Sequence, residues 1–563
     1  MKAKTFLLIL FFNTLLVSCA GPGLREPVEI NLVALNDFHG YLQPSPFSYT
    51  DPGNPDAVIT VQAGGVATLG GLLNKLRQDD PQLLFVGVGD LIGASPPISA
   101  MWADEPSLEA MKLLELRLSS LGNHELDEGK AELLRQINGG CDSPRPEKAC
   151  QWRNDFSGAG FPYIAANLID TETENTLVAP YVIETVRGIK IAFVGAQVED
   201  LASVVSASSM QGIRVEDEAE AINRFIPEIK RKGADIVVAV VHQGGNTLAA
   251  FDQPDCTDLE GDIVDIVERL DPAVDLVLSA HTHEAYLCMV GDVPVTQAAS
   301  YGRLVTHLTL VFEPAGKKLL DVQTRNLIVD PQRYEPDPEL LAWQATVEAR
   351  SRAVLERPIA RIGAATITRV PNRHGESAMG DLVADAQLAA TQALGAQIAL
   401  MNSGGIRSDL VLKDVETPLN FSQVAAVHPF KGTLQVISLT GAQIKAVLEQ
   451  QWQGEGAGSF KPLQISHSFT YRWDGSQPRG QRVLADSLSL DGEPILPTET
   501  YRISVNAFLA DGGDNFSALT EASERIDTGI PDLKALTDYL VAQEKAGAPA
   551  GHAEPAERIL RVD

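Results

Sequence analysis

Short apolar runs alternate with helix-like segments along the first 330 residues of the chain. The runs are rich in Val, Ile and Leu, as is typical of strands buried on both faces of a sheet. The segments between them have the spacing of amphipathic helices. We expect strands at 29–35, 83–90, 190–195, 234–241 and 275–280, and helices at 69–76, 108–116, 218–232 and 262–270. This alternation predicts an α/β sandwich with polar loops beyond the strand ends.

A proline-rich stretch at 331–338 marks a boundary, and a helix-like segment rich in Ala, Leu and Glu follows at 339–356. A second α/β region begins near residue 359. The stretch 43–62 is rich in Pro, Ser and Asp and is predicted to be a surface loop. The expected organisation is a first domain at 28–330, a linker helix at 335–357 and a second α/β domain at 358–563.

The length and charge of the chain limit what it can bind. With 563 residues it exceeds the size at which one hydrophobic core stops growing, which agrees with two domains. It has 45 Lys and Arg against 74 Asp and Glu, a net charge of −29. Acidic surfaces repel nucleic-acid polymers, so we exclude those as partners. An anionic small molecule would need a local basic pocket.

The first residues have the features of an export signal. Lys2 and Lys4 precede an apolar run at 6–17 that is too short to cross a bilayer, so 1–18 is predicted to be a signal peptide. The ending Leu-Val-Ser-Cys resembles a bacterial lipobox, which would make Cys19 a lipidated first residue. Cleavage near Ala20, leaving a free thiol, is the alternative. By this resemblance we expect a lipid-anchored protein of the bacterial cell envelope, on the outer membrane and facing the periplasm or the exterior.

The remaining cysteines are even in number. Cys141, Cys150, Cys256 and Cys288 can form three different sets of two disulfides in an oxidising compartment. We favour Cys141 with Cys150 and Cys256 with Cys288. Because none of them has Cys-x-x-Cys spacing, a zinc ribbon is not expected.

Metal-ligating residue types follow the predicted strands. Four of these strands, at 29–35, 83–90, 234–241 and 275–280, end at or just before an Asp, Asn or His, and the apolar-leaning run 113–121 ends just before Asn123. Several of these positions lie beside a glycine, where the backbone can bend. Hard and borderline ligands of this kind suit two divalent ions. Any one of these histidines taken alone would more often be an ordinary loop residue, but the group together is specific. The residues are Asp37, His39, Asp90, Asn123, His124, Asp127, His242, His281 and His283.

The order Asp-x-His, Gly-Asp, Gly-Asn-His-Glu, His-x-Gly-Gly and His-x-His resembles the calcineurin-like metallophosphoesterases, and more narrowly the bacterial 5′-nucleotidases. The resemblance implies an αββα sandwich that holds two divalent ions, of Zn, Mn, Co, Mg or Ca. It makes Asp90 the bridge between the ions, with Asp37, His39 and His283 on one and Asn123, His242 and His281 on the other. His283 departs from some members of the family, which have an amide there.

The family pattern also suggests a catalytic pair. His124 is expected to stabilise the transition state and protonate the leaving group, and Asp127 is expected to raise the pKa of His124. The alternative for Asp127 is an acidic side chain in the first turn of a helix, where it would stabilise the helix dipole.

The second domain carries motifs that suit an anionic, aromatic ligand. Guanidinium groups match phosphates and carboxylates, and Gly404-Gly405 allows a ligand close to the backbone. The resemblance extends to the 5′-nucleotidase C-terminal domain, in which two aromatic rings stack on a nucleobase. It implies that Phe430 and Phe508 bind the base, that Asn402 and Asp514 bind ribose or a base edge, and that Arg369, Arg373 and Arg407 bind the anionic part. Stacking suits every base, so broad base specificity is expected.

The leading hypothesis is a monomeric metal-dependent hydrolase that converts 5′-nucleotides to nucleosides and phosphate. A related enzyme acting on 2′,3′-cyclic nucleotides, as a phosphodiesterase and 3′-nucleotidase, or on UDP-sugars is the first alternative. A nucleotide-binding surface protein without catalysis is a more distant one, because the ligand set is complete.

Overall fold

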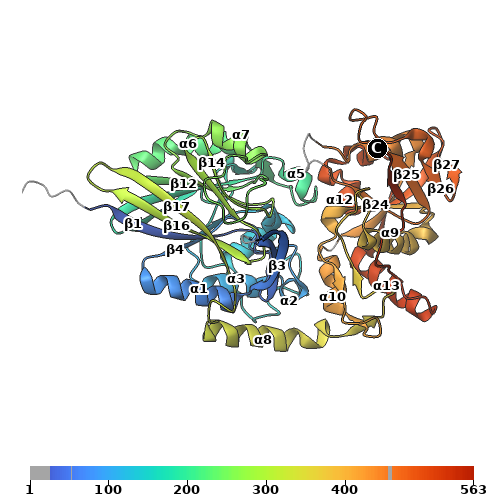
Figure 1. Cartoon of the computed structure of the whole chain (residues 1–563), viewed down its shortest axis with the longest axis horizontal. Helices are drawn as coiled ribbons and strands as arrows, with labels where there is room; N and C mark the ends of the chain where they lie inside the picture. Colours follow the sequence, from blue (N-terminus) through green and yellow to red (C-terminus); the bar gives the residue numbers. More distant parts are fainter. Residues whose placement is uncertain (1–25, 52–53, 431, 454–459) are drawn as a thin grey trace, which may run out of the picture.

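The computed structural model describes residues 26–51, 54–430, 432–453 and 460–563. The predicted signal peptide at 1–18 and Cys19 lie outside the described residues. Two bodies, one formed by each half of the chain, are joined along one side by a long helix (Figure 1). Within the described residues, no helix is both long and apolar enough to span a membrane.

Two six-stranded sheets form the first half of the chain. The first sheet has the order β17 (Lys318–Ile328), β16 (Leu304–Glu313), β1 (Val28–Leu35), β4 (Leu84–Gly87), β5 (Leu118–Ser120) and β6 (Tyr163–Ile164). The second has the order β14 (Ala285–Val290), β15 (Val293–Ala298), β13 (Leu276–Ser279), β12 (Ile236–His242), β10 (Ile189–Gln197) and β9 (Tyr181–Val186).

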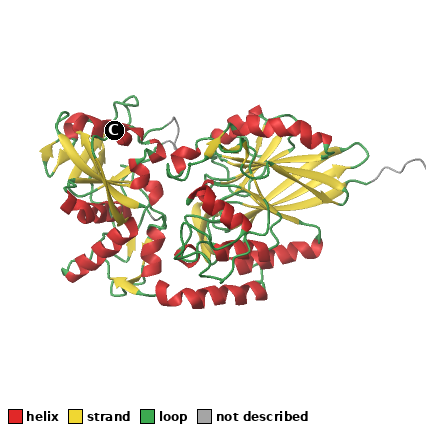
Figure 2. Cartoon of the chain, turned by 180° about the vertical axis from the view of Figure 1, so that it is seen from behind, coloured by secondary structure: helices red, strands yellow, loops and turns green. Residues whose placement is uncertain are grey.

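The sheets pack face to face, with helices on their outer faces. Apolar residues of both sheets, such as Leu32 and Val86 from one and Phe193 and Val238 from the other, form one fully buried cluster. Helices α1 (Val66–Asp79) and α3 (Glu105–Leu113) cover the first sheet, and α6 (Glu218–Arg231) and α7 (Asp262–Arg269) cover the second. The arrangement is the predicted αββα sandwich, and Figure 2 shows its helical and sheet layers.

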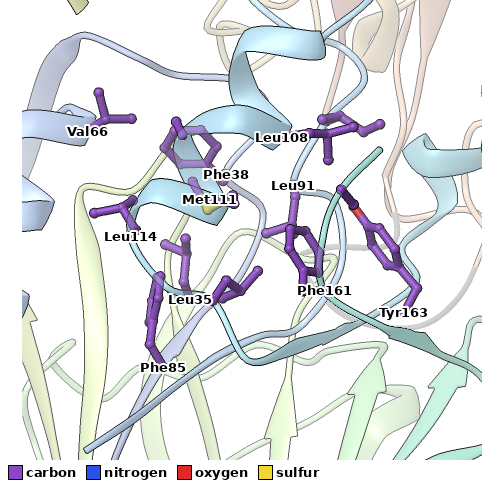
Figure 3. Packing of buried hydrophobic residues seen from close by; sticks show 14 of the residues in the cluster. Leu35, Phe38, Val66, Phe85, Leu91, Leu108, Met111, Leu114, Phe161 and Tyr163 are labelled. Atoms are coloured by element: carbon purple, nitrogen blue, oxygen red, sulfur yellow. The ribbon is translucent and has the colours of Figure 1, made fainter. Parts of the chain in front are cut away.

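The inner strands run parallel within each sheet. β1 pairs in parallel with β4, β4 with β5, and β12 with both β10 and β13. Parallel strands bring their carboxyl ends to one edge, which is where loops of α/β folds carry functional residues. The side chains after β1 and β4 are held by packing: Phe38 and Leu91 are fully buried among Leu35, Phe85 and Met111 (Figure 3).

The prediction of a surface loop at 43–62 is wrong. Residues there form a hairpin of β2 (Pro44–Asp51) and β3 (Asn54–Gly64). Phe47 and Tyr49 point to one face of this ribbon, where both pack against Phe251. The proline-rich composition concealed this alternation, because the ribbon is a separate two-stranded sheet in which prolines do not interrupt a central ladder.

Helix α8 (Pro338–Leu355) connects the halves, close to the predicted 339–356. Asp337 caps it by accepting the amides of Glu339 and Leu340, each at 2.9 Å. Its Leu340 and Val347 are buried in the core of the first half, and its far end reaches α10 (Phe421–Val427) of the second. The connector is therefore packed against both halves.

The second half has a five-stranded sheet and a smaller four-stranded one. The five-stranded sheet has the order β24 (Leu463–Ile465), β20 (Ile398–Asn402), β28 (Thr500–Asn506), β23 (Thr433–Thr440) and β29 (Arg525–Pro531). The smaller sheet has the order β27 (Glu493–Pro494), β26 (Ser489–Leu490), β25 (Phe469–Trp473) and β30 (Ile559–Arg561). Helices α9 (Ala378–Thr391), α11 (Gly441–Glu449) and α13 (Asp532–Lys545) pack against them.

Two disulfides close loops of the first half. Cys141 bonds to Cys150, and Cys256 bonds to Cys288. Both favoured pairings are confirmed.

Candidate active site

Five strand ends of the two sheets converge on one point. Asp37 and His39 follow β1, Asp90 follows β4, His242 ends β12, and His281 and His283 follow β13. Asn123 opens the short 3-10 helix η1 (Asn123–Leu126) after β5. The seven predicted ligands thus come together, although they are spread over 247 positions of the sequence, from 37 to 283.

The ligands fall into two adjoining groups. In the first, His283 Nε2 lies 3.4 Å from Asp37 Oδ1 and 3.0 Å from His39 Nε2. In the second, His242 Nε2 lies 3.2 Å from Asp90 Oδ2. His39 Nε2 is 3.7 Å from that same Asp90 oxygen, so Asp90 lies between the groups. Asn123 Oδ1 contacts His281 Nδ1 at 3.0 Å and completes the second group.

The chemistry of this donor set fits divalent cations. Neighbouring histidines, His283 first, overcome burial and lower the pKa of Asp37 to about 2, and the pKa of Asp90 is likewise far below its usual range. Burial lowers the pKa of His281 to about 3, which leaves a neutral ring with a free lone pair. Two ionised carboxylates are buried here without Lys or Arg partners among the described residues. Buried charges of this kind require a counter-ion.

His242 supports the same assignment. Its Nδ1 donates to the Val88 carbonyl at 2.7 Å, which directs Nε2 toward Asp90. Nε2 is buried and has no aligned hydrogen-bond partner in the described part of the chain. Burial lowers the pKa of this ring, but Asp90 outweighs burial and raises it to about 9, so a metal bound there would displace a proton. His39 is oriented similarly, since its Nδ1 donates to Gly93 O at 2.9 Å.

The backbone at the strand ends is strained. Non-glycine residues rarely have positive φ, yet φ is 48° at Asp37, 47° at His39, 51° at Asp90, 74° at His281 and 60° at His283. Each such conformation costs roughly 1–3 kcal/mol and persists only where the surroundings enforce it. The left-handed backbone conformation at these residues directs their side chains toward the cluster of predicted metal ligands.

Glu125 is a functional residue that the sequence analysis missed. Its carboxylate accepts the amides of Asp90, Leu91 and Gly122 at 2.9, 2.8 and 2.6 Å. It therefore fixes the loop that carries Asp90. The signal for it is the Glu of Gly-Asn-His-Glu, which lies three residues after Gly122 and accepts the Gly122 amide.

His124 and Asp127 form a close pair beside the ligands. His124 Nδ1 lies 3.0 Å from both Asp127 oxygens, and its backbone amide donates to Asp90 Oδ1 at 2.9 Å. Burial would lower the pKa of His124, but Asp127 first and then Asp90 outweigh it, and the pKa is raised. Asp127 precedes α4 (Gly129–Asn138) and its cap Glu128, so it lies outside the first turn of that helix.

A cavity of about 800 Å³ lies between the two halves of the chain. The first half contributes Asp90, Asn123, His124, Asp127, His281 and His283 to its lining, and the second contributes Asn402, Arg407, Phe430, Phe508 and Asp514. The Phe430 ring stacks on His124 with centroids 5.8 Å apart and an interplanar angle of 22°. The Arg407 guanidinium lies 5.8 Å from the Phe430 ring. The predicted substrate groups therefore face the predicted metal ligands.

Hydrogen bonds hold the polar groups of the second half. Asn402 Nδ2 donates to Asp514 Oδ2 at 2.7 Å, and Asn506 Nδ2 donates to Asn402 Oδ1 at 2.9 Å. Arg369 and Arg373 are not among the residues that line the cavity. Arg369 is exposed, with its amide bound to Asp409, and exposed Arg373 bonds to His374. The structure thus brings one of the three predicted arginines to the cavity.

Comparison with known proteins agrees with this geometry. Residues 30–285 match the family described as calcineurin-like phosphoesterase, and residues 354–521 match the one described as 5′-nucleotidase, C-terminal domain. A 5′-nucleotidase of Vibrio cholerae is 26% identical over 86% of this chain and 89% of its own length. The structure of a 5′-nucleotidase precursor from Thermus thermophilus has a TM-score of 0.75 and 26% identity, and the match covers 95% of this chain and 100% of that one.

The endonuclease YhcR of Bacillus subtilis is 27% identical over 92% of this chain. The matched region is only 40% of that relative, so the chain spans less than half the length of that protein.

Proposed function

This chain belongs to the calcineurin-like phosphoesterases that carry a 5′-nucleotidase C-terminal domain, and from that premise we propose that it hydrolyses 5′-nucleotides to nucleosides and phosphate with two divalent ions. The phosphoesterase and 5′-nucleotidase matches support metal-dependent hydrolysis of nucleotide phosphoesters. The observation that carries the finer proposal is the cavity between the two halves, in which the metal ligands face two aromatic rings and an arginine.

Asp37, His39 and His283 would hold one ion, Asn123, His242 and His281 the other, and Asp90 would contact both. Bound ions of this kind supply a nucleophile at neutral pH and neutralise charge on the phosphoryl oxygens. The residues around them set the geometry: Glu125 anchors the Asp90 loop through three amides, and Asn36 holds Asp37 Oδ2 at 2.7 Å.

His124 is the proposed general acid. Its Nδ1 is engaged by Asp127, so Nε2 is the atom that can present a proton to the leaving ester oxygen. Asp127 raises the proton affinity of the ring and fixes its orientation. Arg407 adds positive charge beside this centre, where an anionic phosphate would bind.

The second half would select the nucleoside. Phe430 and Phe508 offer faces for a base, and Asn402 with Asp514 offers polar groups for the ribose hydroxyls. Hydrolysis of 2′,3′-cyclic nucleotides or UDP-sugars is the competing proposal, since the same metal centre could cleave their phosphodiester or pyrophosphate bonds.

A panel of substrates tests the choice. The full chain should release phosphate from AMP and other 5′-monophosphates, and chelator should abolish the release. If kcat/KM is higher for 2′,3′-cyclic AMP or for UDP-glucose than for AMP, that compound and not the 5′-nucleotide is the preferred substrate. No turnover of any of them with added Mn²⁺ or Zn²⁺ would contradict the proposal.

We further propose that the mature protein is anchored to the outer membrane through lipid on Cys19. The support is the sequence Leu-Val-Ser-Cys at 16–19 after a short apolar run. Replacing Cys19 by Ser should move the protein from the membrane fraction to the soluble one, and retention in the membrane fraction would refute the anchor.

A further inference from the structure

Four neighbouring strand ends form a row along one edge of the five-stranded sheet. Asn402 ends β20, and Phe508 follows β28, which pairs in parallel with β20. β23 is antiparallel to both β28 and β29, so its start lies at this same edge, beside the end of each neighbour. Leu434 pairs with Asn506 and Thr433 with Pro531. The row therefore runs from Asn402 through Phe508 and Phe430 to Asp532.

This order places the base-stacking rings between two polar groups. Asn402 and its partner Asp514 lie on one side of Phe508, and Asp532 lies on the other side of the start of β23. A nucleoside whose ribose is at Asn402 and whose base contacts the rings would direct the far edge of the base toward Asp532. Both Gly432 and Asp532 line the cavity.

The Asp532 carboxylate is buried, with 4% of the residue exposed. Its Oδ1 accepts the Leu533 amide at 2.7 Å. Its Oδ2 has no hydrogen bond, and no cation pairs with it, among the residues described. Buried Asp residues are rarely left without a partner, so a free oxygen that faces a cavity suggests a ligand with N–H donors. The first-turn position on α13 explains the contact of Oδ1 but not the free Oδ2.

Gly432 leaves this oxygen accessible. A Cβ at residue 432 would lie 3.2 Å from Asp532 Oδ2, in the space a ligand atom would need. The Gly432 carbonyl accepts the Asp532 amide at 2.9 Å, so the two residues are held together. The missing side chain and the free carboxylate oxygen thus form one feature of the cavity wall.

We infer that Asp532 is a specificity-determining residue that accepts N–H donors from the edge of the base and favours guanine. The inference rests on the proposed nucleotidase function. Guanine presents two adjacent donors, N1–H and the 2-amino group, which match the two oxygens of a carboxylate, because Oδ1 keeps a second acceptor site beside the Leu533 amide. Hypoxanthine and uracil present one ring N–H, and adenine and cytosine place an acceptor nitrogen beside their amino group. Stacking admits every base, and the carboxylate adds a preference to the broad specificity expected from stacking alone.

The test compares kcat/KM of the full chain for GMP, IMP, UMP, AMP and CMP. Burial raises the pKa of Asp532 to about 7, so the assays are run near pH 8.5, where the carboxylate is ionised. GMP should exceed AMP. In Asp532→Asn the side chain has one amide donor and one carbonyl acceptor, which match the ring nitrogen and the amino group of adenine. The ratio of kcat/KM for GMP to that for AMP should therefore fall at least about tenfold. Hydrolysis of p-nitrophenyl phosphate should not change.

Two further variants separate the explanations. Gly432→Ala leaves the carboxylate intact but shields it from the base, so it should also lower the GMP to AMP ratio. This variant also allows the proposal to be tested if Asp532→Asn does not fold. Asp538→Asn removes an exposed carboxylate on the same helix and should leave the ratio unchanged.

The outcomes distinguish the two claims. Nucleotide hydrolysis with an unchanged base ratio in both Asp532→Asn and Gly432→Ala would overturn the role of Asp532 while preserving the proposed function. The absence of nucleotide hydrolysis by the wild-type chain, with p-nitrophenyl phosphate still cleaved, would instead refute the proposed function.

Discussion

The histidines of the site divide into ligands and one non-ligand according to their surroundings. His39 and His242 each donate from Nδ1 to a backbone carbonyl, which leaves Nε2 for a cation. His124 differs, because its Nδ1 contacts a carboxylate of its own segment. This difference is the basis of its proposed role as an acid.

Replacing His124 by Ala should leave the bound metal unchanged and reduce kcat by about 10²- to 10⁴-fold, the usual contribution of a general acid. Metal content and steady-state AMP hydrolysis measure the two effects. His552→Ala, at an exposed histidine of the second half, is the control. Wild-type turnover in His124→Ala would remove this residue from the mechanism.

Replacing Asp127 by Asn should shift the pH dependence. The Asp127 carboxylate is the main group that raises the His124 pKa, so its removal lowers that pKa and the proton is lost at lower pH. The alkaline decline of kcat should therefore begin at lower pH than in the wild type, as profiles from about pH 5 to about pH 9 would show. A decline at the same pH in both proteins would argue that the pair does not act together.

At the scale of elements, the site depends on how strand ends approach one another. Gly122, between β5 and η1, touches the Asp90 loop so closely that a Cβ would overlap Asp90 Oδ1 and the Asp90 amide nitrogen. A side chain there would force the central ligand to move.

Gly122→Ala should therefore weaken metal binding by roughly 10- to 100-fold, the range for disturbed ligand support. Titration of the metal-free variant with Mn²⁺ measures the change. Gly316→Ala is the control, because its Cβ would meet only the end of the flexible Glu313 side chain. Unaltered affinity in Gly122→Ala would show that Asp90 is not held as described.

The sequence predicted the buried strands and the ligands that follow them, because both are local signals. The carboxyl ends of parallel strands lie at one edge of a sheet even when the strands are far apart in sequence. The residues that follow the strands could therefore be predicted to meet. The β2–β3 hairpin was missed because prolines obscured its alternation. Glu125 was missed because it holds backbone amides of a loop that is distant in sequence. The location of Arg369 and Arg373 outside the cavity lining depends on the tertiary fold, which cannot be predicted from the presence of arginine alone.

At the scale of the whole molecule, the two halves share one cavity and depend on each other. The stacking of Phe430 on His124 brings a residue of the second half against the proposed catalytic pair of the first. α8 packs against both halves and supports this arrangement.

Phe430→Ala should reduce kcat/KM for AMP by roughly 5- to 150-fold, the equivalent of the 1–3 kcal/mol that stacking on one base provides. Cleavage of p-nitrophenyl phosphate, which has no nucleobase, should change much less. Phe225→Ala, at a half-buried ring of the first half that lies outside the cavity lining, is the control. Equal losses on both substrates in Phe430→Ala would indicate that the ring supports His124 rather than the base.

The central claim is that five strand ends build one centre for two cations that hydrolyses nucleotides. Its most direct test is to remove metal from the full chain, add Mn²⁺ stepwise and follow phosphate release from AMP. We predict that release rises from background to a plateau at about two ions bound per chain. Full activity in the metal-free protein, or none when two ions are bound, would contradict the account.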